Sequence, residues 1–317
     1  MFKVFVKFSI GSGLLAAATL APAAQLSTDA RTAIPHDVQQ LVVLDYRAMQ
    51  NSSAAMNLKE RVMPAELKQF DEALTKSGLN DNHDVDELAF ALFRTSPGSD
   101  TLTTVGIAQG QFPTADILAK FRAQKLKATA VRTNKIYPMT KAGMVLCFVD
   151  PSTMIFGQKE AVEKALDARD GNSPSMLTNN TIMDAMKTVD SEPLWSVLDE
   201  KGTQTMMRQV LGEAGALTDF ETVRKRLNSS WYSMNFQHGV KFDLTISTGD
   251  SFSSATIASL LTAAVMLRKM SGTDAEKQAL SATDVASDSG KLGIHFSASD
   301  TQFDSLLQSP LFKSMVR

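Results

Sequence analysis

The histidines and the cysteine of the chain form no recognisable metal or nucleophile motif. Cys147 lies in the apolar run 144–149 without a neighbouring His or cation, which predicts a small buried hydrophobe rather than a reactive thiol. No G-x-S-x-G elbow, Walker loop or G-x-G-x-x-G turn follows residue 23. We therefore expect no cofactor, no metal and no local catalytic motif; a hydrolase whose site assembles from dispersed residues stays an alternative. The four histidines, none with H-E-x-x-H spacing, are His36, His83, His238 and His295.

Two sets of carboxylates invite a chemical interpretation. The acidic loop 80–87 has the oxygen ligands that calcium prefers, but it lacks the Gly and the distal Glu of an EF-hand. We favour a polar turn that leads into a strand. Asp45 and Asp199 each end a Val-Leu-Asp run, and paired carboxylates can do acid and base work. Helix N-caps are the interpretation that we favour for both.

One segment combines many cations with no acid. Between residues 117 and 149 there is no Asp or Glu. These cations are candidate ligand-binding residues for an anionic partner, such as a lipid headgroup, a polysaccharide or an acidic protein surface. A solvated face balanced by acids from elsewhere in the chain is the alternative. The residues are Lys120, Arg122, Lys125, Lys127, Arg132, Lys135 and Lys141.

The N-terminus has the pattern of a secretory signal. Lys3 and Lys7 precede an uncharged apolar run over residues 8–20, and Ala21-Pro22-Ala23 offers the small residues that a signal peptidase needs. The run is too short to span a membrane. We expect cleavage near residue 23 and a periplasmic or secreted protein. Without the two lysines the net charge changes from −2 to −4, which argues against a nucleic-acid partner.

Hydrophobic residues make up 44% of the 317 residues, which is enough for a packed core. The order of the predicted helices and strands repeats within the chain. The run Val43-Leu44-Asp45 returns as Val197-Leu198-Asp199 at an offset of 154. Each copy reads strand, helix, hairpin, helix, hairpin, helix. This predicts an α+β fold with two similar halves, each an antiparallel sheet with helices packed on one face. The expected divisions are a signal peptide at 1–23, a first repeat at 24–170, a linker with a bridging helix at 171–190, and a second repeat at 191–317.

The predicted helix 253–270 is rich in Ala and Leu almost all round. We expect it to be buried between layers or between the halves. Its apolar stretch is interrupted by Ser and Thr and followed by Arg268 and Lys269, so we expect no membrane span after signal cleavage.

The segment 35–94, with Pro35-His36-Asp37-Val38 and Asp84-Val85-Asp86-Glu87-Leu88, resembles uncharacterised exported bacterial proteins of duplicated α+β build. The run 194–202 shares the likeness. The resemblance implies export and duplication, and it carries over no activity and no site residues.

These observations predict an exported, non-enzymatic binding or interaction protein. Its expected partner is a small amphipathic or anionic ligand, or an envelope protein, held by the basic segment or in a groove between the halves. A hydrolase would instead bring perturbed carboxylates or a His–Ser pair together in a cleft. A structural envelope partner would expose a large apolar patch.

Overall fold

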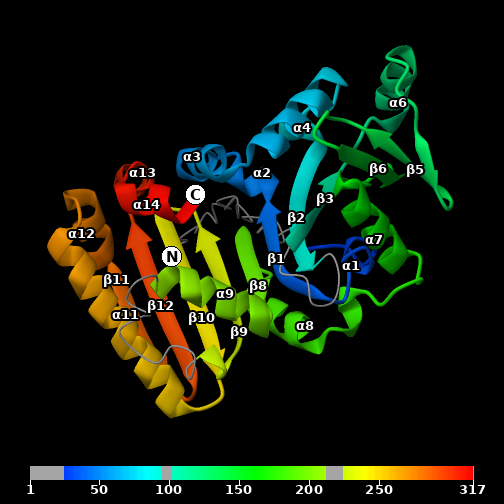
Figure 1. Ribbon diagram of the computed structural model, residues 1–317. Coiled ribbons are helices and arrows are strands. Elements are labelled where there is room, and N and C mark those ends of the chain that lie inside the picture. The colour runs from blue at the N-terminus through cyan, green and yellow to red at the C-terminus, as the bar shows by residue number, and fades with distance from the viewer. Residues whose placement is uncertain (1–24, 95–101, 212–223, 317) are drawn as a thin grey trace, which may run out of the picture.

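The strands of the computed structural model form one twelve-stranded sheet (Figure 1). The structure describes residues 25–94, 102–211 and 224–316. The predicted signal peptide lies outside the described residues, and so does the run Ser96-Pro97-Gly98-Ser99-Asp100, whose residue types predict a hairpin turn. The strand order is β11-β12-β10-β9-β8-β1-β2-β3-β7-β6-β5-β4, and each neighbouring pair is antiparallel. The chain is therefore an α+β protein with an antiparallel sheet, as predicted.

In the first half, the elements are α1 (Thr28–Thr32), β1 (Val38–Asp45), α2 (Tyr46–Met49), α3 (Ser53–Val62), α4 (Ala65–Lys76), α5 (Asp81–Asp84), β2 (Val85–Arg94), β3 (Leu102–Gly110), α6 (Thr114–Ala123), β4 (Thr129–Val131), β5 (Asn134–Pro138), β6 (Met144–Asp150), β7 (Thr153–Gln158) and α7 (Lys159–Arg169). A short 3-10 helix, η1 (Met176–Thr178), and α8 (Asn180–Met186) follow in the predicted linker.

In the second half, the elements are β8 (Leu194–Leu198), α9 (Glu200–Leu211), β9 (Leu227–Asn235), β10 (Val240–Thr248), α11 (Ser251–Ser271), α12 (Asp274–Ser281), β11 (Thr283–Asp288), β12 (Lys291–Ala298), α13 (Asp300–Leu307) and α14 (Pro310–Val316). The pair His238-Gly239 between two strand-like runs predicts a hairpin turn, and the structure confirms it between β9 and β10, where both residues have positive φ.

The two halves meet at β1 and β8, which pair directly. Val42 lies opposite Ser196, its counterpart at the offset of 154. Outward from this pair, β1-β2-β3-β7-β6 on one side corresponds to β8-β9-β10-β12-β11 on the other. Two copies related by a two-fold axis would produce this order; the domain boundaries themselves stay predictions. Backbone hydrogen bonds, rather than a groove, join the halves along β1 and β8.

Helices cover the two faces of the sheet unequally. On β2, Ala89 and Phe93 pack into a cluster with residues of α1, α7 and α8, whereas Phe90 on the other face packs with α4 and α6. In the second half, Leu244 and Ile246 of β10 face α9 and α11. The opposite side of β10 and β12 carries exposed polar side chains.

Helix α11 is exposed along one side, so the predicted burial between layers is wrong. Ile257 and Leu261 pack on the sheet, while Met266 and Met270 are exposed. The helix lies beside the outer strands β11 and β12, with α12 as its helical neighbour (Figure 1). The sequence pattern misleads because small and apolar residues surround the helix, and this composition is typical of buried helices.

Candidate functional site

The outer face of α11 is the most distinctive surface of the described chain. We define it by seven exposed residues, Phe252, Ala255, Ser259, Thr262, Ala263, Met266 and Met270. Phe252 is 79% exposed and Met270 is 83% exposed. The helix contains no charged residue between its start and Arg268, so more than four turns present an uncharged surface. Solvated helix faces normally carry charges, and this one does not.

Three hydroxyl groups of this helix are satisfied by its own backbone. Thr256 donates to the carbonyl of Phe252 at 2.8 Å, Ser259 donates to that of Ala255 at 3.0 Å, and Thr262 donates to that of Ala258 at 2.8 Å. Such bonds to the carbonyl four residues earlier reduce the polarity that a Ser or Thr presents to its surroundings. The outer face of α11 is therefore compatible with an apolar neighbour.

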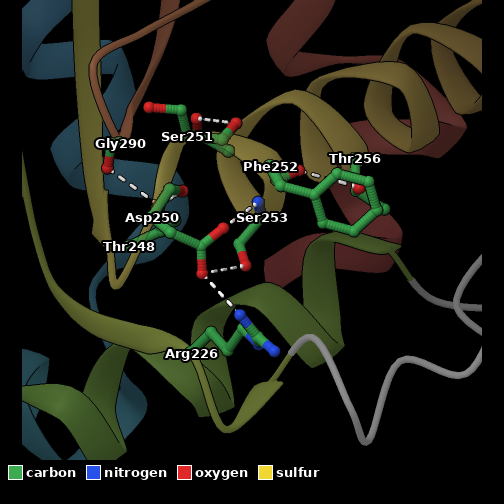
Figure 2. Close-up of polar contacts among 9 residues, drawn as sticks. Arg226, Thr248, Asp250, Ser251, Phe252, Ser253, Thr256 and Gly290 are labelled. Atoms are coloured by element: carbon green, nitrogen blue, oxygen red, sulfur yellow. Dashed lines mark hydrogen bonds and ion pairs between the residues drawn. The ribbon is translucent and has the colours of Figure 1, made fainter.

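Both ends of α11 are held in place. At the N-terminus, Asp250 accepts a hydrogen bond from the Ser253 amide at 2.8 Å and pairs with Arg226 at 2.6 Å (Figure 2). The hydroxyl of Thr248 lies 2.9 Å from the carbonyl of Asp250 and 2.8 Å from that of Gly290, which links this end to the β11–β12 turn. The Ser253 amide, followed by Arg226, lowers the pKa of Asp250.

Replacing Asp250 with alanine is expected to loosen the first turn of α11, because the hydrogen bond that caps the helix and the ion pair with Arg226 are both lost. Amide hydrogen exchange over residues 251–255 should accelerate severalfold. Asp250→Asn keeps an oxygen for the cap and should accelerate exchange less. Because the pKa is lowered, the contribution of the carboxylate should be present above its ordinary pKa and be lost as the pH falls. Unchanged exchange in the alanine variant would contradict this role.

The C-terminal end of α11 leads into α12 through Gly272. Thr273 and Glu276 form a capping box at the start of α12, with the Glu276 carboxylate accepting from the Thr273 amide at 2.9 Å. The other oxygen of Glu276 accepts from the Leu311 amide at 2.7 Å. These contacts connect α12 to α14. Arg268, near the end of α11, is exposed.

The two helix-cap predictions are confirmed. Asp45 accepts from the Ala48 amide at 2.8 Å, and Asp199 accepts from the Gly202 amide at 2.7 Å. The alternative of paired carboxylates is wrong, because β1 and β8 are antiparallel and the two aspartates follow opposite ends of the strand pair. Burial raises the pKa of Asp199 to about 6.

Within the acidic loop at 80–87, residues 81–84 form the short helix α5 and residues 85–87 begin β2, and the carboxylates of α5 contact neighbouring groups. Asp81 accepts from the Tyr46 hydroxyl at 2.5 Å and lies 3.3 Å from the Lys59 ammonium group. Asp84 accepts from the Asn80 amide at 2.7 Å. Within the described ranges, no three His, Cys, Asp or Glu side chains are placed to hold a metal ion. The polar-turn interpretation explains these contacts.

The features expected of a dispersed hydrolase do not converge in the described residues. Glu87, with a pKa raised to about 8 by burial, lies beside Asp45, at the opposite end of the β1–β8 pair from Asp199. His36 lies 2.8 Å from the Thr178 hydroxyl, which also contacts the carbonyl of Ser175 at 2.9 Å. That hydroxyl group is therefore a structural donor rather than an activated nucleophile.

The remaining histidine pair and the cysteine lie apart from each other, and the prediction that Cys147 is a buried hydrophobe is confirmed. His295 pairs with Asp243 at 2.5 Å on the open polar side of β10 and β12. Cys147 is buried, and burial raises its pKa to about 11, so its thiol is not a nucleophile at neutral pH.

The structure places the seven predicted basic residues at the end of the sheet far from α11 (Figure 1). All seven are exposed, on α6, on the β4–β5 hairpin and in the turns beside them. Sequence reasoning identified these cations but missed the hairpin that carries Arg132 and Lys135, as well as the exposure of α11. The signal available for α11 was its long stretch without charge.

No protein-family model matches the chain, and no curated protein matches it. Among solved structures, crystal form I of TP0453 is similar, with a TM-score of 0.52 and 12% sequence identity over 89% of this chain and 98% of that chain. Crystal form IV of TP0453 gives a TM-score of 0.47 and 11% identity over 88% of this chain and 96% of that chain. The first of these similarities extends over most of both chains, and at such low identity it concerns the fold. The chain therefore shares the fold of TP0453.

Proposed function

We propose that this chain is an exported, non-enzymatic envelope protein that binds the surface of a lipid bilayer through the outer face of α11. The observation that carries the proposal is the exposed outer face of α11, which has no charged residue from Phe252 to Leu267. An exposed apolar surface is what the interpretation as an envelope partner predicts. Export is proposed from the N-terminal signal pattern.

A bilayer suits this face better than a folded partner. At 1.5 Å per residue, the 21 residues of α11 extend about 30 Å, which gives a long and narrow contact strip. A specific protein interface needs a partner surface of complementary shape over about 1,000 Å² in total. A bilayer needs no complementary shape. Arg268 and Lys269 at the end of the strip can reach lipid phosphates while the apolar side chains enter the interface.

The orientation of α11 on the bilayer follows from its packing. By length and composition, the helix could cross a membrane. In the folded chain, Ile257 and Leu261 hold one side of the helix on the sheet, and both ends are capped. The outer face alone is available, so the helix lies in the plane of the interface.

The test is flotation with vesicles of phosphatidylcholine, a zwitterionic lipid without net charge. The wild-type protein should float with the vesicles, and Phe252→Glu/Met270→Glu should bind at least tenfold more weakly, because each carboxylate must be desolvated. Both positions are exposed, so we expect the variant to fold, as circular dichroism can show. The matched control is Gln237→Glu/Ser297→Glu, which adds the same charge at exposed positions outside α11.

Two outcomes would overturn the proposal. One is a wild-type protein that stays in the soluble fraction. The other is equal flotation of the α11 variant and the wild type. If the wild type does not bind vesicles and sedimentation shows that it is a dimer, while the α11 variant is a monomer, a second copy of the chain covers this face instead.

A further inference from the structure

The basic residues at the opposite end of the sheet form a second surface. We call the set Lys120, Arg122, Lys125, Lys127, Arg132, Lys135 and Lys141 the basic end. Three members have structural partners within the described chain. Arg132 pairs with Asp167, Lys120 lies against Gly78, and Arg122 donates to the carbonyl of Leu118 at 3.3 Å.

The other four members extend into solvent. Lys125, Lys127, Lys135 and Lys141 are exposed, and none of them forms an ion pair with an acid in the described ranges. The sequence from 117 to 149 also contains no Asp or Glu that could balance these four lysines. An anionic partner would supply the missing negative charge.

Lys125 occupies a backbone position that normally favours glycine. It follows the end of α6 with φ +57°, where the amide of Leu126 donates to the carbonyl of Phe121 at 3.0 Å. This is the αL position that ends a helix, and a side chain there is disfavoured relative to glycine. Arg132 takes φ +53° in the tight turn between Val131 and Asn134, where glycine is also common. Arg132 gains an ion pair with Asp167 at its turn, whereas Lys125 keeps a cation at a position where the backbone favours glycine and no ion pair within the described ranges compensates.

The β4–β5 hairpin adds little to the core. Ile136 is its one fully buried residue, and most of the other side chains are exposed or half-buried. The corresponding part of the second half holds α12 instead. Exposed elements that contribute little burial commonly carry binding functions.

We propose that the basic end binds the anionic phospholipid headgroups of a bilayer, at a site separate from α11. The surface offers cations without an exposed aromatic platform, because Tyr137 packs on Phe121 at 5.1 Å. Lipid phosphates are bound by positive charge and offer no ring that could stack on an aromatic side chain. The site does not depend on α11. If both sites bind, one molecule has bilayer contacts at two distant ends and can join two bilayers.

The experiment compares vesicles of pure phosphatidylcholine with vesicles that are one third phosphatidylglycerol, at low salt. The wild type should bind the anionic vesicles at least tenfold more tightly, and this increment should be lost in the Lys→Gln variant of Lys125, Lys127, Lys135 and Lys141. The control changes four exposed lysines elsewhere to Gln, at Lys201, Lys225, Lys241 and Lys277, and should keep the increment.

The α11 variant separates this proposal from the proposed function. Phe252→Glu/Met270→Glu should lose binding to neutral vesicles and still bind anionic vesicles more tightly than neutral ones. Light scattering should show clusters of anionic vesicles with the wild type and none with either the α11 variant or the basic-end variant.

A single substitution tests the role of Lys125 directly. Lys125→Gly should weaken binding to anionic vesicles severalfold while its unfolding midpoint rises or stays the same, because the αL strain is removed. A lower midpoint with unchanged binding would show that the lysine is structural. An equal anionic increment in the basic-end variant would overturn the proposal, as would binding to dextran sulfate without any binding to anionic vesicles.

Discussion

Replacing Trp195 with alanine is expected to lower the free energy of unfolding by about 3–5 kcal/mol, the usual cost of removing a large buried aromatic ring. Trp195 is 1% exposed on β8. It lies opposite Val43 of β1, in the core cluster that also holds Leu41 and Met186. The ring therefore packs at the junction of the two halves.

Because one sheet runs through both halves, we expect urea to unfold the described fold in a single transition, at a lower concentration in Trp195→Ala. Far-UV circular dichroism is the measurement, since it does not depend on the removed fluorophore. Trp231→Ala is the matched control. This ring on the next strand is half-buried and lies beside Lys291, so its loss should cost less. A variant in which the second half alone unfolds would show that the halves are independent.

Replacing Glu87 with glutamine is expected to stabilise the protein at neutral pH by about 3 kcal/mol. Glu87 is 2% exposed and lies opposite Asp45 across β1 and β2. Burial, followed by the charge of Asp45, raises its pKa from 4.5 to about 8, while Arg31 acts in the opposite direction. One side-chain oxygen of Glu87 is buried without a hydrogen-bond partner. The folded chain therefore favours the neutral acid.

The pH dependence follows from the raised pKa. The folded state holds the proton of Glu87 more tightly than the unfolded state, so the favourable contribution is complete below pH 4.5 and is lost as the pH rises to about 8. Glutamine resembles the neutral acid and does not ionise. The wild type and Glu87→Gln should be about equally stable near pH 4 and should diverge as the pH rises.

Urea unfolding between pH 4 and pH 8 measures this difference. Asp86→Asn is the matched control, because it removes one negative charge from the residue immediately before Glu87. Asp86 is half-exposed and pairs with Arg47. This control should not reproduce the gain in stability at neutral pH. Equal pH profiles for the wild type and Glu87→Gln would contradict the raised pKa.

Much of the local structure could be predicted from the sequence. The strand that ends at Asp45 and the strand that ends before Asp199 were both predicted, and each aspartate caps the following helix. The reason is that alternation, turn residues and caps act over a few neighbouring residues. The β4–β5 hairpin was missed for the same reason. Its turn has Arg132 at a positive-φ position, and no Gly or Pro marks it.

The candidate sites depended more on tertiary structure. Sequence spacing identified the seven cations of the basic end, but not the hairpin that presents two of them. The uncharged stretch of α11 was visible as well, yet its composition predicted burial.

The sequence by itself determined the order of most elements apart from the β4–β5 hairpin, the antiparallel α+β class, the caps at Asp45 and Asp199 and the distribution of charge along the chain, because these properties depend on near neighbours. Tertiary structure decided that β1 and β8 join the halves in one sheet, that Asp45 and Asp199 lie at opposite ends of that pair, and that α11 lies at an edge with its outer face exposed. The physical reason is that strand pairing and the layer that covers a helix depend on residues far apart in the chain, and local patterns do not encode those contacts.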